Sequence, residues 1–65
     1  MRKLLRLPAV KELTGISRSS IYRLVSEGKF PKPIHVKVPK MTAWNSDDID
    51  NWIEKQIADD RERRD

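Results

Sequence analysis

The segment from Thr14 to Pro33, T-G-I-S-R-S-S-I-Y-R-L-V-S-E-G-K-F-P-K-P, constrains the fold more than any other part of this chain. Gly15 can adopt the left-handed conformation that ends a helix, and Ser17 stands where an N-cap hydroxyl can satisfy a free backbone N–H. Apolar residues then recur at helical spacing at positions 21, 24 and 25, and Gly28 follows. The segment therefore predicts a tight turn and then a capped amphipathic helix from about Arg18 to Glu27.

The polar face of this helix carries side chains suited to nucleic acid. Arg18, Ser19, Tyr22 and Arg23 lie over its first two turns and mostly off the apolar stripe. A DNA-binding helix-turn-helix has this layout: two short helices joined by a glycine-containing turn, with Arg, Ser and Tyr on the second helix. A plain helical hairpin that happens to carry two arginines is the alternative that this segment alone leaves open.

Length and composition narrow the classes of function. A chain of 65 residues has room for one domain, residues 1–65, and a deep catalytic cleft is hard to build at that size. There is no cysteine, and the single His35 cannot form a zinc site alone. No apolar run reaches the length of a signal peptide or a membrane span. We therefore expect a cytoplasmic protein that is not an enzyme, needs no cofactor or metal, and binds no membrane.

Positive charge is concentrated in the first two-thirds of the chain. Residues 1–44 contain ten Lys and Arg against two Asp and Glu, whereas residues 45–65 contain four against eight, within a net charge of +4. This asymmetry predicts a surface that faces a polyanion, although a solvated basic face remains the alternative. RNA is a less favoured partner than DNA, because aromatic residues make up only 6% of the chain and the binding of single-stranded RNA needs exposed aromatic side chains on which bases can stack.

The residues around the central segment predict short elements. Leu4, Leu5 and Leu7 predict an extended lead-in, and Pro8 suits the first turn of a helix from Ala9 to Leu13. Val10 and Leu13 would face inward. After the second helix, Pro31 and Pro33 force extended backbone, and Phe30 between the helix and these prolines is expected to anchor in the core.

A β-hairpin is predicted from Ile34 to Trp44. Ile34, Val36 and Val38 alternate with polar residues, the period of a half-buried strand, and Pro39-Lys40 marks the tip. Thr42 to Trp44 would form the return strand, with Trp44 in the core. Lys37 and Lys40 make the tip basic, with His35 nearby, as in the wing of a winged helix; a plain solvated turn is the alternative.

A third helix is predicted after Asn45. Ser46 suits its N-cap, and Asp47 and Asp48 complement the positive end of the helix dipole. One apolar stripe follows at Ile49, Trp52, Ile53 and Ile57. The other faces are acidic, which predicts that this helix points away from DNA, and residues 58–65 are expected to be a frayed charged tail. The predicted fold is mainly α with a small β-hairpin: three helices plus a two-stranded wing.

Four motifs together resemble the AlpA-type family of small phage and prophage regulators, which is related to MerR-like winged-helix domains and to small excisionases. The motifs are R-L-P-A-V at 6–10, T-G-I-S-R-S-S-I-Y-R-L at 14–24, E-G-K-F-P-K-P at 27–33 and A-W-N-S-D-D-I-D-N-W-I at 43–53, and the resemblance covers about residues 4–57. It implies a MerR-like winged helix-turn-helix whose helix from Ser17 to Glu27 enters the major groove and whose wing runs from Ile34 to Trp44. Family members usually carry glycine and arginine at the wing tip; here the tip has no glycine, and Lys40 stands as the counterpart of the arginine.

The chemistry of the side chains predicts how DNA would be bound. Arginine can bond a guanine edge bidentately, serine can reach a base or a phosphate, and lysines neutralise phosphate without distinguishing sequence. The predicted DNA-binding residues are Ser17, Arg18, Ser19, Tyr22, Arg23, Lys29, Lys32, Lys37 and Lys40. Catalysis is not supported, because Ser17, His35 and an Asp are residue types without any indicated geometry.

Three functions remain open at this level. The first is a sequence-specific transcriptional regulator of a phage, prophage or other mobile element, for which the resemblance implies control of an integrase gene. The second is an excisionase, or recombination directionality factor, that bends DNA. The third, of another class, is a protein-interaction module that binds a regulator or integrase through the acidic helix from Asp47 to Asp60. Double-stranded DNA is the expected partner, with an integrase or a cooperatively bound second copy as further candidates, and no small-molecule ligand is expected.

Overall fold

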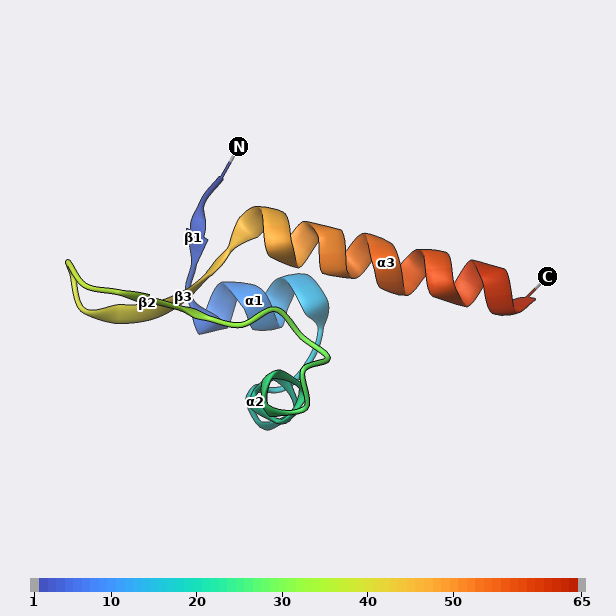
Figure 1. Ribbon diagram of the computed structural model, residues 1–65, viewed down its shortest axis with the longest axis horizontal. Helices are drawn as coiled ribbons and strands as arrows, with labels where there is room; N and C mark the ends of the chain where they lie inside the picture. Colours follow the sequence, from blue (N-terminus) through green and yellow to red (C-terminus); the bar gives the residue numbers. More distant parts are fainter. Residues whose placement is uncertain (1, 65) are drawn as a thin grey trace.

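The computed structural model describes residues 2–64 and shows a winged helix-turn-helix that is mainly helical (Figure 1). In chain order the elements are β1 (Leu4–Leu5), α1 (Leu7–Thr14), α2 (Arg18–Ser26), β2 (Ile34–Val36), β3 (Met41–Asn45) and α3 (Ser46–Arg64). The fold is elongated, 46 × 27 × 19 Å, with the β2–β3 hairpin and the C-terminal end of α3 at opposite ends of the long axis. Within residues 2–64 no helix combines the length and the apolar character needed to cross a membrane.

The turn between α1 and α2 forms as the sequence predicted. Gly15 ends α1 in the left-handed conformation, with φ at 71°, and its N–H donates to the carbonyl oxygen of Lys11 at 2.8 Å. A side chain at this φ would be strained, which is why glycine stands here. The Thr14 hydroxyl accepts a hydrogen bond from the N–H of Ile16 at 3.3 Å, so the turn satisfies its own backbone groups.

The core lies where α1, α2, α3 and β3 meet. Its buried side chains are Val10, Ile21, Phe30, Trp44 and Ile49. The inward positions of Phe30 and Trp44 are confirmed. Burial of each large apolar side chain contributes roughly 1.5–3 kcal/mol, so these few residues supply most of what holds so small a domain together.

The predicted inward position of Leu13 is wrong, because its side chain is 53% exposed. The buried face of α1 is set by Val10, with Leu7 packed against the core and Thr14 half-buried. These three residues follow a spacing of three and four, which is one face of a helix. Leu13 lies to one side of that face.

The predicted two-stranded wing is confirmed as the β2–β3 hairpin, and a third short strand, β1, extends its sheet. The strand order is β1-β3-β2, with both pairs antiparallel, and Leu5 lies opposite Trp44 while Ile34 lies opposite Ala43. The extended lead-in predicted at Leu4 and Leu5 is this strand, but two residues are too few to show a period of two, so its pairing with β3 was not predicted. Pairing with β1 satisfies backbone groups of β3 that would otherwise form an open edge.

The wing has the predicted position, but its first strand is shorter than predicted and the apolar alternation of that strand is not half-buried. Strand β2 ends at Val36, and residues 37–40 form the turn. Val36 is half-buried, but Ile34 is 40% exposed and Val38, inside the turn, is 88% exposed. The hairpin projects away from the core (Figure 1), so solvent reaches both of its faces.

Helix α3 begins one residue earlier and continues further than predicted. Asn45 Oδ1 accepts a hydrogen bond from the N–H of Asp47 at 3.0 Å, and the helix starts at Ser46, which had been predicted as its cap. Ile49 is buried, but Ile57 at the end of the predicted stripe is 43% exposed, because by that point α3 has left the core. The segment expected to fray from residue 58 is helical to Arg64, since residues 46–64 contain no Gly or Pro.

Candidate nucleic-acid interface

Helix α2 presents a polar face to solvent because its other face is anchored. Ile21 is wholly buried, and Leu24 and Val25 pack against the core. The opposite face exposes all four side chains that the sequence predicted there: Arg18, Ser19, Tyr22 and Arg23. The structure therefore brings these four together on one accessible helix face.

Ser17 has a structural task at the start of α2. Its Oγ accepts a hydrogen bond from the N–H of Ser20 at 3.4 Å and donates one to Ser20 Oγ at 3.0 Å. The predicted N-cap is thus confirmed. Since the hydroxyl already has two partners within the helix, Ser17 contributes to a binding surface mainly by fixing where α2 begins.

A row of aromatic and cationic groups runs from the core to the surface of α2. Trp44 is wholly buried, and its ring centroid lies 6.3 Å from that of Tyr22. The Arg18 guanidinium carbon lies 5.8 Å from the Tyr22 ring centroid, within the range of a cation–π interaction. Tyr22 therefore connects Arg18 to the core and limits the positions that the guanidinium group can take.

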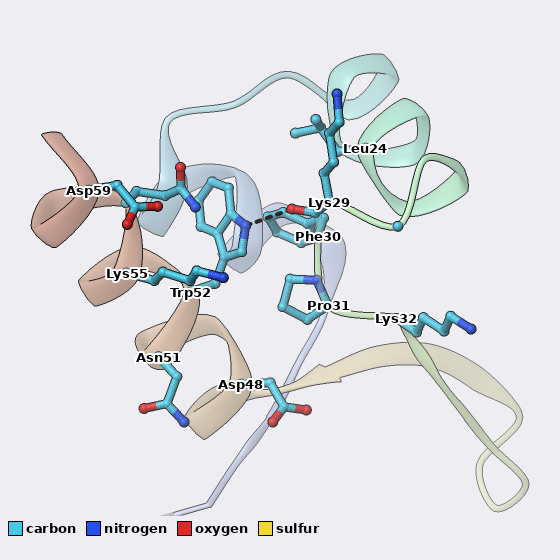
Figure 2. A pocket seen from close by; sticks show the side chains of 12 residues that line it. Leu24, Lys29, Phe30, Pro31, Lys32, Asp48, Asn51, Trp52, Lys55 and Asp59 are labelled. Atoms are coloured by element: carbon cyan, nitrogen blue, oxygen red, sulfur yellow. Dashed lines mark hydrogen bonds between the residues drawn. The ribbon is translucent and has the colours of Figure 1, made fainter. Parts of the chain in front are cut away.

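The segment that leaves α2 is fixed by two tryptophans of other elements. Trp52 Nε1 donates to the carbonyl oxygen of Lys29 at 2.9 Å, the bond dashed in Figure 2, and Trp44 Nε1 donates to that of Pro31 at 3.0 Å. Between these bonds Phe30 is buried against the Trp52 ring, with ring centroids 4.8 Å apart. The backbone on which Lys29 and Lys32 are mounted is thereby held in place.

Lys29 and Lys32 are both exposed, Lys29 just after the C-terminal end of α2 and Lys32 on the extended segment that leads to β2 (Figure 2). Lys29 Nζ lies 3.7 Å from Glu27 Oε1, an exposed ion pair. Glu27 is one of only two acidic residues in positions 1–44 and stands at the C-cap of the predicted recognition helix. Its carboxylate offsets part of the positive charge that Lys29 would offer to a phosphate.

The wing carries the remaining predicted residues. Lys37 and Lys40 are exposed at the two ends of the turn, which contains a cis peptide bond between Val38 and Pro39 and no glycine. A shallow hollow beside the turn is lined by His35, Val36, Lys37, Lys40, Met41 and Thr42. The nine predicted residues therefore form two groups, one on α2 and its exit segment and the other at the wing tip.

Two further polar residues belong with these groups and were not predicted. Arg6 lies beside the wing, with Nη1 3.5 Å from Met41 Sδ. Ser26 is exposed on α2, one turn beyond Tyr22 and Arg23. Helical spacing could have indicated Ser26, whereas Arg6 could only have been assigned once β1 and β3 were known to pair.

Acidic side chains gather on α3. Asp48, Asp50, Glu54, Asp59, Asp60 and Glu62 are all exposed there. Asp47 is paired with Arg2, with 3.6 Å between its Oδ2 and the arginine Nε. Within residues 2–64, no three His, Cys, Asp or Glu side chains are grouped in a way that could hold a metal ion.

The turn between α1 and α2, the exposed polar face of α2 and the projecting hairpin define a winged helix-turn-helix protein. The family described as "Prophage CP4-57 regulatory protein (AlpA)" matches residues 3–57 of this sequence. The chain belongs to this AlpA family, as its motifs had indicated.

A relative from Enterobacteria phage P4, called "Uncharacterized protein ORF88", is 38% identical over 56 residues. The alignment covers 86% of this chain and 62% of that protein, so the chain spans less than two-thirds of the relative's length. No solved structure matches the chain.

Proposed function

We propose that this protein is a sequence-specific DNA-binding regulator of transcription in a phage, prophage or other mobile element, acting in the host cytoplasm without catalysing a reaction. Helix α2 lies in the major groove, and the wing lies on the adjacent backbone or groove. The observation that carries the proposal is the face of α2 itself. Arg18, Ser19, Tyr22 and Arg23 are exposed together on one side of a helix whose other side is anchored in the core.

Two features support this assignment. Four exposed cations are placed to neutralise phosphates. Lys29 and Lys32 lie in the segment after α2, and Lys37 and Lys40 lie at the wing tip. Apart from Glu12 and Glu27, the acidic residues described in residues 2–64 lie on α3, whose C-terminal end lies at the opposite end of the molecule from the wing (Figure 1). A duplex approaching α2 and the wing would therefore meet mainly positive charge.

The first test is the dependence of binding on salt. The affinity of the full chain for a random 25-base-pair duplex is measured by fluorescence anisotropy at several salt concentrations. We expect log affinity to fall linearly with log salt, with a slope of about −0.9 per phosphate contact and about four to seven contacts. Lys40→Ala should make the slope shallower by about one contact, whereas Arg61→Ala, which removes an exposed cation from the far part of α3, should leave it unchanged. A flat salt response would refute the proposal.

A second experiment separates transcriptional control from excision. Bound sites are mapped by footprinting across the host genome that carries the element. Sites over a promoter support the regulator, and sites confined to an attachment region indicate an excisionase instead. Either class of site can recruit an integrase or a second copy of the chain as an additional partner.

One observation favours a protein-interaction function beside DNA binding. Residues 54–62 of α3 are exposed throughout, and the family match ends at residue 57. An acidic helix that extends beyond the core is a suitable surface for a basic partner protein. If the full chain binds no duplex DNA but does bind an integrase in solution, this second function replaces the first.

A further inference from the structure

The wing tip is apolar at its centre and basic at both ends. Val38 is 88% exposed, more than any other large apolar side chain described in residues 2–64. Pro39 beside it is also exposed, and Lys37 and Lys40 flank the pair. Val38 packs against nothing in the core, so the fold does not explain why an apolar residue stands there.

The tip is presented by a firmly held hairpin. Strand β3 places Ala43 and Trp44 in the core, and β2 pairs with it from Ile34 to Val36. Because one end of β3 is buried, the position of the turn is set when the domain folds. A partner that contacts the tip therefore meets a preorganised surface, and little conformational entropy is lost on binding.

This combination of groups suits one kind of contact with DNA. Many proteins that bend DNA insert apolar side chains, proline among them, between base steps from the minor groove, and cations beside the wedge neutralise phosphates. Single exposed apolar residues are common on protein surfaces and need no explanation by themselves. Here the apolar pair lies in the turn of the hairpin between two lysines, and this turn forms one end of the long axis of the molecule (Figure 1). Two apolar residues are too few to hold a protein on a lipid surface.

We propose that Val38 and Pro39 form an apolar wedge that enters the minor groove beside the major-groove site of α2 and bends the duplex there. Lys37 and Lys40 contact the phosphates on either side of the wedge. Flexible pyrimidine–purine steps are the easiest to open, so the wing selects sequence by deformability although it forms no hydrogen bond to a base. This inference rests on the proposed function, because it names how the wing of a DNA-bound molecule acts.

The test uses a substitution that changes polarity and almost nothing else. Val38→Thr keeps the β-branched shape and adds a hydroxyl group to a side chain outside the core. Ile34→Thr is the matched control, since Ile34 is a β-branched, partly exposed residue at the base of the same hairpin. Circular dichroism first confirms that both variants are folded, and Val38→Ala provides a second variant if the threonine disturbs the turn.

Two properties of the full chain are then measured on the duplex recovered by footprinting. The bend is measured by energy transfer between dyes at the duplex ends. The preference for flexible steps is measured with duplexes that carry a TA or an AA step under the wing. We expect wild type and Ile34→Thr to bend the duplex and to prefer the TA step by about fivefold or more, and Val38→Thr to lose most of both effects with its salt slope unchanged.

The outcomes separate this inference from the proposed function. If Val38→Thr bends the duplex and prefers the TA step as wild type does, the wedge is refuted while DNA binding stands. The same holds if wild type binds its site without bending it. If wild type binds no duplex at all, the proposed function fails, and the wedge fails with it.

Discussion

Replacement of Trp52 tests whether the segment that leaves α2 is held from α3. In the structure the Trp52 indole both donates to the Lys29 carbonyl oxygen at 2.9 Å and packs on Phe30. Trp52→Ala removes both interactions. Trp52→Phe keeps a ring against Phe30 and removes only the hydrogen bond and part of the buried area.

The expected magnitudes follow from these contacts. Truncation of a buried aromatic residue to alanine costs about 3–5 kcal/mol, and since Trp52 is only partly buried, we expect about 3 kcal/mol for Trp52→Ala. Trp52→Phe should cost about 1 kcal/mol, the net contribution of one hydrogen bond. A domain of 65 residues has a total free energy of unfolding of about 3–10 kcal/mol, so the alanine variant should lose between about a third and nearly all of it.

The assay is thermal and urea unfolding followed by far-UV circular dichroism. At about 4–8 °C per kcal/mol for a domain of this size, the phenylalanine variant should melt about 4–8 °C below wild type. The matched control is Ile57→Ala, on the same helix and the same sequence stripe. Ile57 is 43% exposed and outside the core cluster, so its truncation should cost well under about 1 kcal/mol.

Two results would refute this reasoning. If Trp52→Ala has the same melting temperature as wild type, Trp52 does not stabilise the fold, and α3 is free to contact a partner along this face. If Trp52→Ala and Ile57→Ala lose the same free energy of unfolding, the whole apolar stripe of α3 is buried, contrary to the exposed position of Ile57.

Three further substitutions test the interface and the turn. Glu27→Gln removes the carboxylate beside Lys29 and should raise affinity for any duplex by about two- to fivefold, measured by anisotropy at low salt; unchanged affinity would place the C-terminal end of α2 away from DNA. Gly15→Ala should lower the free energy of unfolding by about 1 kcal/mol, measured by urea unfolding, because alanine is strained at a φ of 71°. At least one of Arg18→Ala and Arg23→Ala should lose roughly 1–3 kcal/mol of binding free energy on the footprinted site and much less on scrambled duplex, whereas Lys40→Ala should weaken binding to the two duplexes alike. If each arginine variant loses the same binding free energy on the two duplexes, α2 does not contact base edges.

Local signals in the sequence predicted the elements that carry the candidate interface. The Ser17 cap, the Gly15 turn and the stripe with Ile21 depend on neighbours within a few residues, and all three are confirmed. The exposed face of α2 follows from the same stripe, because helical geometry alone decides which side chains lie opposite it. Whether that face binds DNA stays a prediction.

The errors fall where a distant contact or its absence decides the outcome. Strand β1 exists because Leu4 and Leu5 pair with β3, some 40 residues away along the chain. Ile57 keeps the spacing of a core residue but lies where α3 has passed beyond the other elements, so no partner covers it. Val38 keeps a period of two but lies in the turn. Periodicity identifies a face that can be buried, and tertiary structure decides how far along the element the burial extends.

The two tryptophans show how such distant contacts bear on function. Both indole N–H groups bond backbone carbonyl oxygens of one short segment, at Lys29 and Pro31, from elements that come later in the chain. The sequence places each tryptophan on the inner side of its own element, but nothing in its pattern indicates a shared target. With both bonds formed, Lys29 and Lys32 are fixed relative to α2 and to the base of the wing, because Trp44 also lies on β3 beneath Tyr22. The residue types of the candidate interface are thus visible in the sequence, whereas the geometry that would let them act together depends on two side chains that are not themselves proposed to contact DNA.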